Sequence, residues 1–98
     1  MIVVRDVFQL KFGKAREAKA LWREALEMHK KMGLGSAEVH IDLVGPYYTL
    51  VLQSRYRSLN HYENKMEEIM KNSDWENWYQ KFIPLVESGR REIFTILE

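Results

Sequence analysis

One apolar stripe constrains the fold of this chain more than any other feature. Between Lys14 and Met32, apolar residues recur at steps of three and four, the spacing of one face of an α-helix. Charged residues fill the rest of the segment, and Gly33 can adopt the left-handed conformation that ends a helix. Residues 2–11, before the stripe, are rich in β-branched and aromatic side chains, as is typical of a strand. The stripe consists of Ala18, Leu21, Trp22, Ala25, Met28 and Met32.

The middle of the chain has the pattern of a hairpin followed by a second helix. Residues 36–44 and 47–56 are predicted to be strands, separated by the turn-forming pair Gly45 and Pro46. The hydroxyl of Ser58 can cap the helix that follows. The apolar positions of that helix are Leu59, Tyr62, Met66, Ile69 and Met70.

The second helical region is predicted to split near residues 72–74. Ser73 and Glu76 have the spacing of a capping box, so a new helix should begin at Asp74. This helix carries aromatic side chains at helical spacing, namely Trp75, Trp78, Tyr79 and Phe82.

The C-terminal residues 90–98 are predicted to form a fourth strand, after Pro84 and Gly89 have ended the helical region. The order of elements is therefore strand, helix, two strands, helix, strand. Short connections and right-handed crossovers make this a ferredoxin-like α+β fold, a four-stranded antiparallel sheet with the helices on one face. Residues 1–98 are too few for two cores, so we expect one domain.

Alternation along the strands predicts which side chains face away from the helices. The more apolar face should meet the helices, with Asp6 as an exception among Val4, Phe8, Leu10, Val39, Ile41, Leu43, Tyr48, Leu50 and Leu52. The other face mixes Val3, Val7, Val44 and Val51 with the polar residues Arg5, Gln9, His40, Asp42, Thr49 and Gln53. Because an exposed sheet face is normally polar, we expect a homodimer in which two such faces enclose a partly polar lumen. Those six polar residues are the predicted ligand-binding residues.

The composition excludes several other classes of partner and site. The chain has no cysteine, so disulfides and thiolate metal sites are impossible and a cytoplasmic location is expected. Its 15 basic and 14 acidic residues are intermixed without a basic stripe, which argues against nucleic acid. No apolar run approaches the ~20 residues of a membrane span. No sequence motif for a metal ion or a cofactor is present.

Three segments of the chain resemble the NIPSNAP-like proteins of the dimeric α/β-barrel superfamily: IVVRDVFQLKFGK, WENWY and FIPLVESGRREIFTI. The resemblance implies a ferredoxin-like protomer and a face-to-face dimer. The wider superfamily includes cofactor-independent monooxygenases, haem-degrading enzymes, chlorite dismutase-type proteins and ligand-sensing domains. The catalytic asparagine, tryptophan and histidine of the haem-degrading branch have no convincing match here, and a shared fold cannot choose among these chemistries.

His40 and Asp42 are the candidates for acid–base chemistry. Residues two apart on a strand point the same way, with Cα atoms roughly 6.5–7 Å apart, so Asp42 could hold His40 as an acid or base. Alternatively, both side chains meet water on an edge strand or pair across the dimer. A single pair without a nucleophile or an oxyanion hole specifies no reaction. His29 and His61 are expected to be solvated or boundary residues.

Two other clusters have competing interpretations. The four aromatic residues after position 74 could line a pocket for a planar ligand, although such spacing more often indicates core. Arg90 and Arg91 could clamp an anionic ligand, or lie solvated or lightly paired beside Glu87 and Glu92.

Two functions remain open at this point. The first is a non-catalytic homodimer that binds a small, partly apolar ligand in its lumen, or a purely structural assembly. The second is a monooxygenase-like enzyme for an electron-rich aromatic or haem-like substrate that itself activates oxygen. In that case His40 and Asp42 would be catalytic, and Arg5 or Gln53 would orient the substrate.

Overall fold

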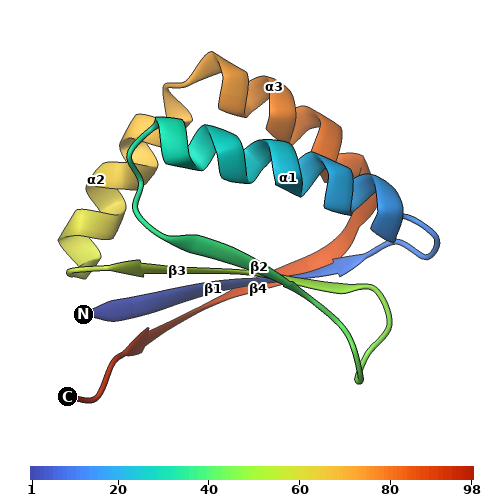
Figure 1. Cartoon of the computed structure of the whole chain (residues 1–98), viewed down its shortest axis with the longest axis horizontal. Coiled ribbons are helices and arrows are strands. Elements are labelled where there is room, and N and C mark those ends of the chain that lie inside the picture. Colours follow the sequence, from blue (N-terminus) through green and yellow to red (C-terminus); the bar gives the residue numbers. More distant parts are fainter.

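The structure, a computed structural model, describes residues 1–98 and places all three α-helices on one side of a single sheet (Figure 1). The elements in chain order are β1 (Ile2–Leu10), α1 (Ala15–Lys31), β2 (Ala37–Ile41), β3 (Thr49–Tyr56), α2 (Leu59–Met70), α3 (Ser73–Phe82), the short 3₁₀ helix η1 (Ile83–Leu85) and β4 (Val86–Thr95).

The strands lie in the order β2-β3-β1-β4, and every neighbouring pair is antiparallel. The two central strands, β1 and β3, are joined through α1 and β2, while α2 and α3 lead from β3 to the opposite edge strand β4. This arrangement confirms the predicted ferredoxin-like α+β fold, including the split in the second helical region.

The hairpin between β2 and β3 is more open than its sequence predicted. Strand β2 ends at Ile41 and β3 begins at Thr49, so the expected strand positions Leu43 and Val44 lie in the loop, 96% and 94% exposed. Tyr48 has a φ of 58°, a left-handed conformation that no regular strand contains. The backbone therefore leaves the sheet earlier than apolar alternation alone indicates.

The last strand begins four residues earlier than predicted, at Val86 rather than Arg90. Gly89 was expected to close the helical region, but it lies within β4 opposite Phe8. A Cβ atom at Gly89 would lie 3.2 Å from Cδ1 of the Phe8 ring. The glycine thus provides space for an aromatic side chain instead of ending a helix.

A side-chain cap marks the start of α2 and another marks the start of α3. The Ser58 hydroxyl accepts a hydrogen bond from the His61 N–H at 3.1 Å, which confirms the predicted cap of α2. Helix α3 is capped by Asn72, whose Oδ1 accepts from the Trp75 N–H at 3.0 Å. The capping box predicted at Ser73 is therefore wrong, because Asn72 occupies the capping position one residue earlier.

Two clusters of buried side chains join the helices to the sheet. The larger one packs α1 and α3 on β1 and β3 through Leu10, Ala18, Trp22, Ala25, Leu50, Trp78, Phe82 and Leu85. The smaller one lies near the N-terminal end of β1 and contains Ile2, Val4, Tyr56 and Tyr62. In the apolar stripe predicted for α2, Leu59 and Met70 are 54% and 75% exposed, because only one edge of this helix contacts the sheet.

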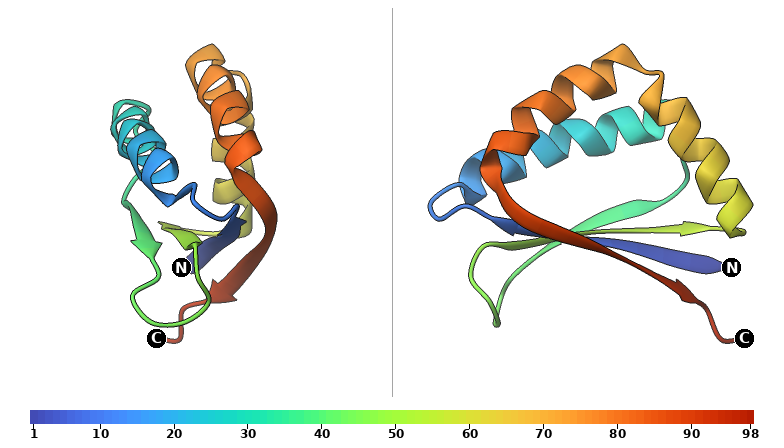
Figure 2. Two further views of the ribbon diagram at one scale, coloured as in Figure 1. Left: turned by 90° about the vertical axis from the view of Figure 1, so that its right-hand side faces the viewer. Right: turned by 180° about the vertical axis from the view of Figure 1, so that it is seen from behind.

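The β2–β3 loop and the C-terminal end both bend toward the side of the sheet that no helix covers (Figures 1 and 2). They flank what we call the open face, the sheet side that carries Val3, Arg5, Val7, Val51, Gln53 and Phe94. None of the helices is long and apolar enough to cross a membrane.

Candidate functional site

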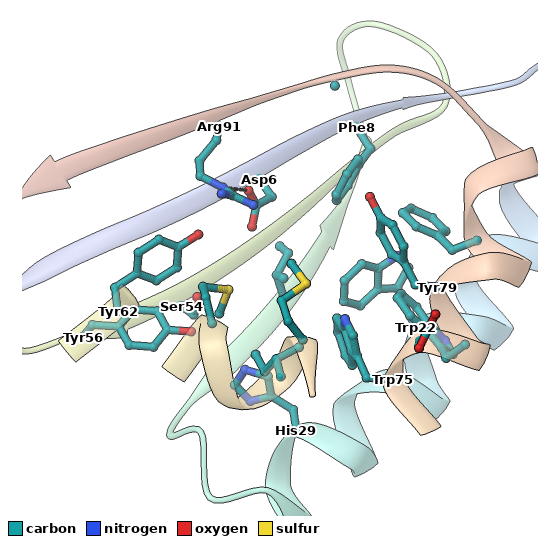
Figure 3. A pocket seen from close by; sticks show the side chains of 18 of the residues that line it. Asp6, Phe8, Trp22, His29, Ser54, Tyr56, Tyr62, Trp75, Tyr79 and Arg91 are labelled. Carbon is teal, nitrogen blue, oxygen red and sulfur yellow. Dashed lines mark hydrogen bonds and ion pairs between the residues drawn. The ribbon is translucent and has the colours of Figure 1, made fainter. Parts of the chain in front are cut away.

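A cavity of about 550 Å³ lies between the helix-facing side of the sheet and the three helices (Figure 3). Strands β1, β3 and β4 form one side of it, and side chains from α1, α2 and α3 form the other. Its volume is within the range of roughly 300–1,000 Å³ that is usual for small-molecule sites.

Aromatic side chains form one wall of this cavity. Trp22 of α1 lies edge-on to Trp78 of α3, with ring centroids 4.7 Å apart, and Trp75 lies 4.8 Å from Trp78. The Trp78 indole N–H donates to the Leu21 carbonyl at 2.6 Å, which fixes the position of this ring. The six aromatic residues of the wall are Phe8, Trp22, Trp75, Trp78, Tyr79 and Phe82. A flat, largely apolar molecule fits such a surface.

Aromatic residues of α3 belong to the core, as the more usual interpretation predicted, and they also line the cavity. Trp78 and Phe82 are buried in the main core, 3% and 1% exposed, and they also line the cavity. Trp75 is half-buried and Tyr79 is 45% exposed at the cavity edge. One wall consequently packs the helices together and shapes the space beside them.

An ion pair lies on the sheet side of the cavity, opposite the helices (Figure 3). Arg91 Nε donates to Asp6 Oδ1 at 2.6 Å, and the two residues are directly opposed in the β1–β4 ladder. The guanidinium carbon also lies 5.7 Å from the centre of the Tyr62 ring. Burial alone would lower the pKa of Arg91, but the hydrogen bond and the charge of Asp6 raise it above its usual value.

Charges are unusual on the apolar side of a sheet. Asp6 was the exception among the residues predicted to face the helices. Its ion pair with Arg91, directly opposite on β4, explains how a charge is accommodated there. A partly buried ion pair is weak evidence for a stabilising role, because desolvation offsets much of the attraction. Charged groups that face a cavity are candidates for ligand contact.

His29 also lines the cavity, although it was expected to be solvated or at a boundary. Its side chain is 5% exposed because α1 directs it toward the sheet and α2. Burial lowers its pKa below the usual 6.5, and a hydrogen bond with the backbone of Gly35 partly opposes this shift. The imidazole is therefore neutral at neutral pH.

Two more polar atoms belong to side chains that line the cavity and have no hydrogen-bond partner within the chain. They are the indole nitrogen of Trp22 and the hydroxyl of Tyr62, both buried. An indole N–H can only donate, and a phenol can donate by rotating its hydrogen. Burial raises the pKa of Tyr62, so its hydroxyl keeps its proton at neutral pH.

The residues predicted to bind a ligand lie elsewhere. Arg5, Gln9 and Gln53 lie on the open face, and none of the six predicted residues lines the large cavity. Gln9 Nε2 donates to the Tyr47 carbonyl at 2.6 Å, and Gln53 Nε2 donates to Glu38 at 3.3 Å. Asp42 and Thr49 border a second hollow of about 470 Å³ beneath the β2–β3 loop.

The structure gives His40 and Asp42 separate partners. His40 Nε2 lies 3.1 Å from Glu38 Oε1, and Asp42 Oδ1 accepts the backbone N–H of Thr49 at 3.1 Å. Asp42 thus closes the hairpin, since its own backbone N–H also donates to the Thr49 carbonyl at 3.2 Å. No group of three or more His, Asp or Glu side chains is arranged to hold a metal ion.

Sequence reasoning missed Tyr62, Ser54 and the pairing of Asp6 with Arg91 as parts of a site. The available signal was the position of Asp6 among apolar neighbours on the helix side. A charge at such a position needs a partner, and Arg90 and Arg91 were basic candidates on the last strand. The pairing of Arg91 with Asp6 depends on the β1–β4 register, which the sequence does not specify.

The fold and the cavity define a ferredoxin-like domain with a ligand-sized space between sheet and helices. The family model of NIPSNAP matches residues 5–98, so the chain belongs to the NIPSNAP family. A comparison with curated proteins found no match.

Solved structures of NIPSNAP proteins have the same fold. A NIPSNAP family protein from Agrobacterium tumefaciens superimposes with a TM-score of 0.91 at 20% identity, covering 99% of this chain and 93% of the other. An uncharacterized NIPSNAP domain protein from Burkholderia xenovorans gives 0.89 at 14% identity, covering 99% and 95%. A structure described as an antibiotic biosynthesis monooxygenase gives 0.78 at 12% identity, covering 100% of both chains. At these identities the likeness concerns the fold alone.

Proposed function

We propose that this protein is a homodimer that binds a small aromatic molecule in the cavity between the sheet and the helices of each protomer. The observation that carries this proposal is the cavity of about 550 Å³ with six aromatic side chains on one wall and an ion pair on another. A site with an apolar wall and a few placed polar groups is typical of small-molecule recognition. The absence of cysteine favours a cytoplasmic location.

The ligand is placed inside the protomer rather than in the lumen between two sheets. None of the six polar residues predicted to bind a ligand lines this cavity, and several open-face side chains already contact neighbours, as Gln53 does with Glu38 and Arg90 with Glu92. The open face therefore serves the dimer, and the helix-facing side serves the ligand.

Exposed apolar side chains support the dimer. Phe94 is 46% exposed on the open face, and Leu43 and Leu97 are almost fully exposed on the two segments that flank it. A second copy facing the first would cover these groups without any additional helix. The Nε atom of Arg5 is buried on this face without a partner in the chain, and a facing protomer could supply one.

Calorimetric titration with 2-naphthamide, a neutral two-ring probe, tests the cavity. We expect saturable binding by the wild-type protein and a loss of at least about tenfold in Leu52→Phe, because the larger ring would occupy space at the cavity wall. Leu59→Phe is the matched control, since Leu59 is exposed and does not line the cavity. Equal binding by all three proteins would place the probe elsewhere and contradict the proposal.

Sedimentation at micromolar concentration tests the dimer. The proposal requires a particle of twice the 11.8 kDa mass of the chain, and a well-folded monomer would refute this part of it.

A monooxygenase-like enzyme is the second candidate, favoured by the similarity to the antibiotic biosynthesis monooxygenase structure and by the aromatic wall. A reaction in the cavity would involve Asp6, His29 and Arg91 rather than His40 and Asp42, which do not line it. Oxygen uptake with a quinol such as 1,4-dihydroxynaphthalene tests this candidate. Uptake at the protein-free rate would exclude the reaction for that substrate class, whereas uptake abolished by His40→Ala in an intact dimer would place the chemistry on the open face.

A further inference from the structure

The guanidinium of Arg91 is only partly used by its contact with Asp6. The ion pair joins a single nitrogen, Nε, to a single oxygen, Oδ1. The two Nη groups, with four N–H donors between them, have no partner in the chain. Arginine commonly uses such a pair of parallel donors to bind a carboxylate at two points.

The surroundings orient this guanidinium at the edge of the cavity. Asp6, only 15% exposed, fixes the Nε side, and the guanidinium carbon lies over the Tyr62 ring, 5.7 Å from its centre. The Arg91 side chain itself is 55% exposed and lines the cavity. Its free donors are therefore both oriented and accessible to a molecule lying against the aromatic wall.

The free Nη groups of Arg91 are the charged donors that remain at this cavity. The Asp6 carboxylate already accepts from Arg91, and the Trp22 indole N–H and the Tyr62 hydroxyl, although without a partner in the chain, are fully buried atoms. Arg90 borders the cavity, but its guanidinium contacts Glu92 on the opposite side of the sheet, so it supplies no charge here. A complementary ligand must bring acceptors, and an anionic oxygen pair matches an arginine best.

We infer that the ligand of this cavity is an aromatic carboxylate, with its carboxylate on the free Nη groups of Arg91 and its rings against Trp22, Trp75 and Trp78. The inference rests on the proposed cavity binding and specifies its ligand class. Asp6 is in this arrangement a positioning residue, which orients Arg91 and competes electrostatically with the ligand.

A series of probes with one ring system and different charge tests the inference on the wild-type protein. The probes are 2-naphthoate, neutral 2-naphthamide and the cation 2-naphthylmethylammonium, titrated by calorimetry at one ionic strength. We expect 2-naphthoate to bind at least about tenfold more tightly than the amide, the ratio that a charge-assisted hydrogen bond provides, and the cation to bind most weakly. Equal affinities for anion and amide, or a preference for the cation, would overturn the inference.

Three variants locate the charge effect. Arg91→Gln should weaken 2-naphthoate about tenfold while changing 2-naphthamide less than about twofold, because only the anion uses the guanidinium. Arg23→Gln, an exposed arginine of α1 outside the cavity, makes the same change in net charge and should leave both affinities unchanged. Asp6→Asn keeps a side-chain oxygen that can accept from Arg91 Nε but removes the competing negative charge, so it should strengthen 2-naphthoate at least about threefold.

The variants also separate this inference from the proposed function and from a structural role. If neither 2-naphthoate nor 2-naphthamide binds to the wild-type protein, cavity binding itself fails. If both bind and Arg91→Gln changes them equally, Arg91 only shapes the cavity and the carboxylate assignment is wrong. Should Arg91→Gln fail to fold, the sign of the Asp6→Asn effect decides: weaker 2-naphthoate binding would overturn the inference.

Discussion

The two faces of the sheet carry charged residues in different surroundings. On the helix-facing side, Asp6 and Arg91 form one ion pair among apolar and aromatic side chains beside a cavity. On the open face, Glu38 lies close to both His40 and Gln53, and Arg90 contacts Glu92. The open-face ion pairs lie at the surface, whereas Arg91, which is also partly exposed, keeps free donors beside an apolar wall. The candidate site is identified by a single ion pair among apolar side chains, and not by the number of charges on that face.

The largest expected difference between the faces concerns folding stability. Phe82 is 1% exposed on the helix side, so Phe82→Ala should lower the free energy of unfolding by about 3–5 kcal/mol through lost burial and an added void. Chemical denaturation measures this loss, which should not depend on protein concentration.

Phe94→Ala is the matched change on the open face. Because Phe94 is 46% exposed in the protomer, its loss should mainly raise the dissociation constant of the dimer, measured by sedimentation. If Phe94→Ala destabilised the protein as much as Phe82→Ala at every concentration, the two faces would not differ in the way described.

A smaller effect is expected at Gly89, which faces Phe8 on the helix side. Gly89→Val should cost about 1–3 kcal/mol, because an added Cβ would lie 3.2 Å from the Phe8 ring and the two methyl groups beyond it must displace that ring. The displaced ring would enter the cavity, so calorimetry should also show weaker 2-naphthamide binding. Ser88→Val, one residue away and opposite Gln9 on the open face, should preserve that binding. Unchanged binding in Gly89→Val would mean that Phe8 does not limit the cavity.

A pH-dependent effect is expected from His29. Burial lowers the pKa of His29 in the folded state, so below the unfolded value of about 6.5 the unfolded chain binds a proton more readily. The contribution of His29 to folding stability is complete above a pH of about 6.5 and declines as the pH falls below this value. Thermal unfolding between about pH 7.5 and 5 should show a shallower decline in His29→Gln than in the wild type. Identical slopes in the two proteins would contradict the burial of His29.

The smallest folding effect is expected at Leu43, in the loop beside the open face. Leu43→Ser should change the free energy of unfolding by less than about 0.5 kcal/mol, because the side chain is 96% exposed in the protomer. It should nevertheless weaken dimerisation, and sedimentation at decreasing concentration measures this. A dimer as tight as the wild type would remove the loop from the proposed interface.

Local patterns predicted most of the secondary structure, because helices and strands bury one face at a fixed period. The stripe from Ala18 to Met28 identified α1, and the Ser58 cap placed the start of α2. The failures occurred where a tertiary contact replaced a local signal. Gly89 has the character of a breaker in sequence, but in the sheet it makes room for Phe8.

The sequence by itself determined the order of elements and the apolarity of the helix-facing side, since both depend on neighbours a few residues apart. Only the tertiary structure decided where a ligand fits. Asp6 and Arg91 are 85 positions apart, and their contact exists because β1 and β4 align in one particular register. The contact between Trp22 and Trp78 also depends on tertiary structure, because it forms only when α1 packs against α3. A cavity depends on such long-range pairings, and local periodicity contains no information about them.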